Sequence, residues 1–113
     1  MNERRDAEQR RSQRNKTYVK VLLGSSGAPG YIRDLSREGC QLAFMRNPAV
    51  KKGDLLDIEV LPSEEMAVGR FSMTVRIVWV REDPVYLMAG GLISSVRGEK
   101  AEQRIGQLYR YYA

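Results

Sequence analysis

Short apolar runs that alternate with polar positions fill the middle of the chain, and residues typical of turns separate them. In one run Met73, Val75, Ile77 and Trp79 fall on one side, and the other side carries Ser72, Thr74, Arg76 and Val78, as in a strand buried mainly on one face. The pair Gly90-Gly91 predicts a bulge or a close backbone approach inside the last run. The expected strands are residues 16–23, 31–33, 40–45, 55–61, 71–80 and 85–93.

The final segment changes period from two to about 3.6. Ala101, Ile105, Leu108, Tyr109 and Tyr112 recur at helical spacing, which predicts a C-terminal helix that plugs one mouth of the structure. Six short strands with local turns favour an all-β fold, a six-stranded antiparallel barrel of the split or Greek-key kind. The expected organisation is an arm over residues 1–15, a barrel over 16–95 and a helix over 96–113.

Charge is concentrated at the N-terminus. The chain has 113 residues, enough for one domain, and a formal charge of +5. Residues 1–20 carry seven cations and three anions, a net +4, so the remainder is nearly neutral. A flexible basic arm on a neutral body attracts polyanions in general, including nucleic acid and anionic lipid.

Several function classes are disfavoured. The chain has no histidine and one cysteine, Cys40, which argues against Cys/His or Ser/His catalysis and the usual zinc sites. We expect Cys40, Trp79 and the methionines to lie in the core. The charged N-terminus does not resemble a secretory signal, and no apolar run is long enough to span a membrane. We therefore expect a cytoplasmic protein without enzymatic activity and without a cofactor.

Two motifs carry candidate chemistry, and the first is basic. Arg10 and Arg14 are four residues apart, with Arg11 beside them, so Arg10 and Arg14 point the same way in either a strand or a helix. Guanidinium groups bind phosphate and the O6/N7 edge of guanine through paired hydrogen bonds, and they also stack on flat rings. This spacing indicates an anionic, planar ligand.

The second motif is a turn between two apolar runs. Asp34 offers a carboxylate to the donor edge of a guanine, and Ser36 offers a hydroxyl. Gly39 lacks a Cβ, so the backbone can turn tightly or approach a ligand closely. Arg37 stands beside Glu38, whose carboxylate would repel phosphate unless the guanidinium neutralises it.

The RxxxR segment followed by DxSxxG resembles the paired signature of the PilZ family over about residues 8–95. The resemblance implies a stand-alone receptor that binds cyclic di-GMP and passes the signal to a protein partner, with motility, biofilm or virulence as the output. It implies a site made of Arg10, Arg11, Arg14, Asp34, Ser36, Arg37 and Gly39, with the arm closing over the ligand. Many members have two glycines in the turn, whereas here Glu38 precedes Gly39.

Two alternatives remain. A ligand-free PilZ adaptor would share the fold, although such members typically lack motif residues that this chain has. A nucleic-acid-binding barrel would share the basic arm, but it would need exposed aromatic residues interleaved with basic ones. We expect no nucleic acid polymer as the partner.

Overall fold

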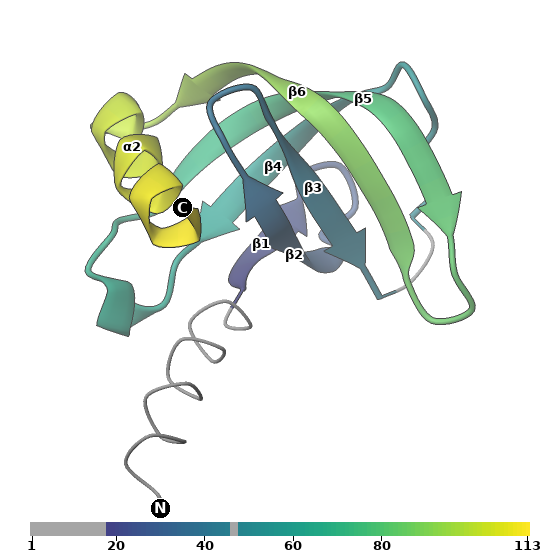
Figure 1. Ribbon diagram of the computed structural model, residues 1–113, viewed down its shortest axis with the longest axis horizontal. Coiled ribbons are helices and arrows are strands. Elements are labelled where there is room, and N and C mark those ends of the chain that lie inside the picture. The colour runs from purple at the N-terminus through teal and green to yellow at the C-terminus, as the bar shows by residue number, and fades with distance from the viewer. Residues whose placement is uncertain (1–17, 46–47) are drawn as a thin grey trace, which may run out of the picture.

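Six antiparallel strands close into a barrel in the computed structural model, which describes residues 18–45 and 48–113 (Figure 1). The 3₁₀ helix η1 (Glu64–Met66) lies between the fourth and fifth strands, and helix α2 (Ala101–Tyr112) follows the sixth. The strands are β1 (Val19–Leu23), β2 (Pro29–Leu35), β3 (Gly39–Phe44), β4 (Leu55–Leu61), β5 (Phe71–Glu82) and β6 (Leu87–Arg97).

The order around the barrel is β1-β2-β3-β6-β5-β4, and β4 closes the ring against β1. Three strands joined in series and a fourth that returns beside the first form a Greek key. The all-β, six-stranded antiparallel barrel and its C-terminal helix, both expected from the sequence, are confirmed.

The barrel interior follows the period-two pattern. Val19, Val21 and Leu23 of β1 are buried, while Lys20 between them is exposed. Helix α2 covers one end of the barrel (Figure 1), and its buried residues Ala101, Ile105 and Leu108 join the same core. The apolar positions predicted at helical spacing are therefore confirmed as part of the core, because they pack into the end of the barrel that α2 covers.

Trp79 was expected on the inward face of β5, and this prediction is wrong. Ile77 is opposite Gly91 and Trp79 is opposite Gly90, so Val78 is an extra residue in β5. This bulge shifts the alternation by one position, and Trp79 lies on the outer surface with 37% of its area exposed. The close backbone approach expected at Gly90-Gly91 is confirmed, because a Cβ at Gly91 would overlap the carbonyl oxygen of Arg76, whereas the extra residue opposite this pair is in β5.

Two smaller expectations also need correction. Met45, expected in the core, is 49% exposed. Strand β2 is longer than the expected 31–33, because Pro29 already lies opposite Leu22, and Asp34 and Leu35 pair with β3. The first residue of the DxSxxG motif is therefore in a strand rather than in a free turn.

Candidate ligand-binding site

The DxSxxG motif forms the connection between β2 and β3. Asp34 is opposite Gln41, and the backbone N–H of Leu35 donates to Asp34 Oδ1 at 3.0 Å. The N–H of Ser36 donates to the carbonyl oxygen of Gly39 at 2.9 Å, which closes the turn. Within the described residues only one carboxylate oxygen of Asp34 is hydrogen-bonded, so the exposed side chain retains acceptor capacity for a ligand.

The next residues of the turn are already partly engaged. Ser36 Oγ donates to Glu38 Oε1 at 3.2 Å. The guanidinium carbon of Arg37 lies 5.3 Å from the ring centre of Tyr109 on helix α2. This cation–π contact joins the turn to the helix.

Gly39 is needed for packing against β6. A Cβ at this position would overlap the carbonyl oxygen of Gly91, which a backbone cannot easily move away. Gly39 is also not among the residues of positive φ, so the turn does not require its left-handed freedom. The close approach expected at Gly39 is therefore made to a neighbouring strand.

The arm joins the barrel close to this turn. The hydroxyl of Tyr112 lies between β1 and β2, where Oη accepts from the N–H of Val19 at 2.9 Å and donates to the carbonyl of Ile32 at 2.5 Å. The guanidinium of Arg33 lies 5.2 Å from the ring centre of Tyr18, the first described residue. The chain therefore enters the barrel beside β2, one residue from Asp34.

Arg10, Arg11 and Arg14 lie outside the described residues. Of the expected site, the structure brings together Asp34, Ser36, Arg37 and Gly39 at one corner of the barrel. This corner lies near Tyr18, the first described residue after the segment that carries the three arginines.

The sequence analysis missed Trp79 as a surface residue of this region. Asp34 is opposite Gln41, Gln41 is opposite Gly90, and Gly90 is opposite Trp79. These residues form one row across four strands, and three steps of about 4.8 Å place its ends about 14 Å apart. The indole lies over Gly90, where a Cβ would collide with it. The signal in the sequence was Gly90, because a glycine inside a strand often makes room for another group.

Burial controls the ionisation of the neighbouring side chains. Burial raises the pKa of the Cys40 thiol to about 12, and the Asp34 carboxylate adds to the effect. Cys40 is thus a buried small residue, as expected, and not a thiolate nucleophile. Burial likewise raises the pKa of Tyr112 above its ordinary value, so its hydroxyl stays protonated and donates to Ile32.

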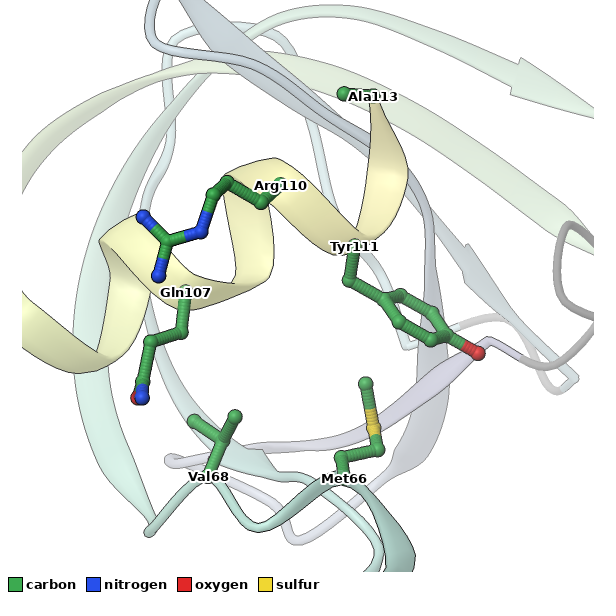
Figure 2. Close-up of a pocket in the computed structure, with 6 residues that line it drawn as sticks. All are labelled: Met66, Val68, Gln107, Arg110, Tyr111 and Ala113. Carbon is green, nitrogen blue, oxygen red and sulfur yellow. The ribbon is translucent and has the colours of Figure 1, made fainter.

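A cavity of about 470 Å³ lies elsewhere, between helix α2 and the segment around η1 (Figure 2). Met66 and Val68 form one wall, and Gln107, Arg110 and Tyr111 of the helix form the other. None of the lining residues belongs to the β2–β3 turn. The described walls of this cavity offer a guanidinium and an amide beside apolar side chains, without the carboxylate and the serine hydroxyl that the turn brings together.

Across residues 18–45 and 48–113 no cluster of three or more histidine, cysteine, aspartate or glutamate side chains could hold a metal ion. Over the same residues, no helix combines the length and apolar character needed to cross a membrane.

Comparison with known proteins gives two results. Among curated proteins, the chain is 37% identical over 87 residues to ribosomal RNA small subunit methyltransferase H of Bartonella quintana (strain Toulouse), and 36% identical to that of Bartonella henselae. Each match covers 75% of this chain but only 26% and 25% of the relatives, so the chain spans about a quarter of their length. The family model of the PilZ domain matches residues 4–109. This match covers nearly the whole chain, which therefore belongs to the PilZ family, whose domains are of the cyclic di-GMP-binding type.

Proposed function

We propose that the protein is a cyclic di-GMP receptor whose site lies on the outer surface of the barrel, between the β2–β3 turn and the arm. The observation that supports this most directly is the row from Asp34 to Trp79, beside the entry point of the RxxxR segment. A carboxylate and an indole on one row offer an acceptor for the guanine N1 and N2 donors and a flat surface for stacking.

The arginines supply the other half of recognition. Arg14 stands four positions before Tyr18, and an extended chain of that length reaches at most about 14 Å. Arg14 can therefore contact a ligand held at Asp34, where its guanidinium would bind a phosphate or the O6/N7 edge of guanine. Arg10 and Arg11 would close over the other side of the ligand.

Arg37 offers a route for the signal. Its guanidinium lies on Tyr109, and a bound phosphate would compete with the ring for that cation. Loss of the contact would release the turn from helix α2 and change the surface that a protein partner meets. In this proposal the relay starts at the β2–β3 turn and continues through the helix.

Titration calorimetry with cyclic di-GMP and cyclic di-AMP tests the site. We expect saturable binding with preference for the guanine ligand, because adenine has a donor where guanine has O6. Asp34→Asn keeps an acceptor for Leu35 but loses the charge, so affinity should fall by about 1.5–3 kcal/mol. Glu59→Gln, an exposed change on β4, is the matched control and should bind normally. Equal affinity for the two dinucleotides, or none for either, would refute the proposal.

The arm has its own test. Arg14→Ala should weaken binding by about 1.5–3 kcal/mol, since it removes a charge-assisted contact. Arg4→Ala removes a charge from the same segment outside RxxxR and should leave affinity nearly unchanged. Normal binding by Arg14→Ala would show that the arm is only a solvated basic segment.

A nucleic-acid-binding barrel is the second candidate, favoured by the basic N-terminal segment and by the names of the curated relatives. Binding to RNA would release counterions from a polymer, so its affinity should fall steeply with salt. A dinucleotide with two phosphates should show a shallow salt dependence. Tight, steeply salt-dependent binding to single-stranded RNA, without a response to cyclic di-GMP, would support this alternative.

A further inference from the structure

Part of the outer barrel surface is unexpectedly apolar. Tyr31 of β2 is opposite Ala43 of β3, and Ala43 is opposite Met88 of β6. Ala43 alternates with the inward residues Leu42 and Phe44, so it faces outward. Ala43 and Met88 are nonetheless buried, and neither belongs to the barrel core. Two buried apolar residues therefore lie on the outer face of the barrel.

Two cavities that share Tyr86 lie beside these residues. One of about 270 Å³ is lined by Tyr18, Tyr31, Arg33, Ala43 and Tyr86. The other, of about 220 Å³, lies at the β5–β6 turn, where its walls include Met45, Asp83 and Val85, and Tyr86 lines both. We call the exposed residues Tyr31, Met45, Val85 and Tyr86 the tyrosine face; their exposed fractions are 40, 49, 58 and 39%. Exposed apolar residues grouped around cavities mark an interaction surface.

The charges at the two ends of the tyrosine face are opposite. Arg33 lines the first cavity, and Lys20 is opposite Tyr31 on β1. Asp83 lines the second cavity at the other end. Asp83 lies 3.6 Å from Arg81 in a solvent-exposed ion pair, which contributes little and exchanges easily for another partner.

We propose that the tyrosine face is a twofold interface between two copies of this chain. In such an interface residue i of one copy meets residue j of the other, and the reverse holds too. A twofold axis through Tyr86 would bring Arg33 of each copy to Asp83 of the other. It would also place Val85 of each copy in the other copy's 270 Å³ cavity. Asp83 would repel an acidic partner or RNA, and Arg33 would repel a basic partner. A surface that carries both charges therefore fits a second copy of itself best.

The tyrosine face shares no residue with the proposed ligand site, although Arg33 at its end adjoins Asp34, and its pairing needs no cyclic di-GMP. Sedimentation velocity of the unliganded protein over a wide concentration range should show a monomer–dimer equilibrium. Tyr86→Ser should weaken the dimer at least about tenfold, because it removes the ring shared by both cavities. Leu55→Ser, on β4 and 65% exposed, is the matched control and should dimerise normally. A protein that stays monomeric at every concentration would overturn the proposal.

A charge exchange tests the pairing itself. Arg33→Asp and Asp83→Arg should each weaken the dimer about tenfold or more, because each places like charges together. The double variant should recover most of the wild-type dimerisation. If neither single change weakens the dimer, or the double variant is the weakest, the proposed arrangement is wrong. Cyclic di-GMP titrations of the wild type and of Tyr86→Ser separate the two proposals. A wild-type protein that dimerises without binding the ligand would refute only the receptor function, and one that binds the ligand but stays monomeric would refute only the interface.

Discussion

Tyr112 ties the C-terminal helix to the start of the barrel, and its replacement by phenylalanine tests that role. Its hydroxyl bridges the N–H of Val19 and the carbonyl of Ile32, which are opposite each other in the β1–β2 ladder. Tyr112→Phe keeps the ring and its packing but leaves one donor and one acceptor without this bridge. Because the Tyr112 hydroxyl is partly buried, water cannot fully replace the two lost hydrogen bonds.

The expected cost follows from these two bonds. Leaving a buried polar group unsatisfied costs about 1–3 kcal/mol. Because Val19 and Ile32 face each other, partial closure of the gap would recover some of the loss, so we expect a total of about 1–3 kcal/mol. For a domain of this size, that corresponds to a Tm lowered by roughly 5–20 °C.

Thermal unfolding followed by circular dichroism measures this change. Tyr31→Phe is the control, because its hydroxyl makes no hydrogen bond among the described residues and its Tm should hardly move. Amide exchange at Val19 should accelerate in Tyr112→Phe, since the N–H loses its acceptor. An unchanged Tm together with unchanged exchange at Val19 would refute the bridge and, with it, the helix as an anchor for the start of β1.

Three further predictions concern single residues. Trp79 is the only tryptophan, so cyclic di-GMP should quench its emission by stacking, and an unchanged spectrum at saturation would exclude Trp79 from the site. Gly39→Ala should lower the free energy of unfolding by about 1–3 kcal/mol in urea titrations, because its Cβ meets the Gly91 carbonyl. Cys40, with its pKa raised from 9.0 to about 12, should react with a disulfide reagent only after unfolding. Because the pKa of Cys40 is higher in the folded state than in the unfolded state, the stability linked to Cys40 is full below pH 9 and falls as the pH rises towards 12. A urea midpoint that stays constant between pH 9 and 12 would contradict the burial of Cys40.

The fold could be predicted because the inward positions of most strands keep a strict period of two. Val19 and Val21 in β1, and Met73 and Val75 in β5, alternate with exposed or half-buried residues as expected. The period holds because a closed barrel has one apolar interior and an outer surface open to solvent. Helix α2 was equally clear, since its buried positions follow a helical spacing.

Trp79 shows why the rest could not be predicted. Its position depends on the extra residue Val78, and a bulge is fixed by pairing with the neighbouring strand rather than by the local pattern. The same limit applies to the bridge of Tyr112 to Ile32, which joins residues 80 positions apart. The DxSxxG motif located the turn, but the packing of Arg37 on Tyr109 depends on where the helix lies.

The filled interior of the barrel explains why recognition must take place outside it. Side chains from all six strands and from helix α2 fill the core, and ring closure leaves no open sheet to which a ligand could add. A ligand can therefore be held only by outward side chains, turns, the helix and the arm. Gly90 creates a place for the Trp79 ring on that outer surface, and Gly39 lets β3 approach β6 beside it. These glycines thus shape the surface between Asp34 and Trp79, even though neither needs to touch the ligand.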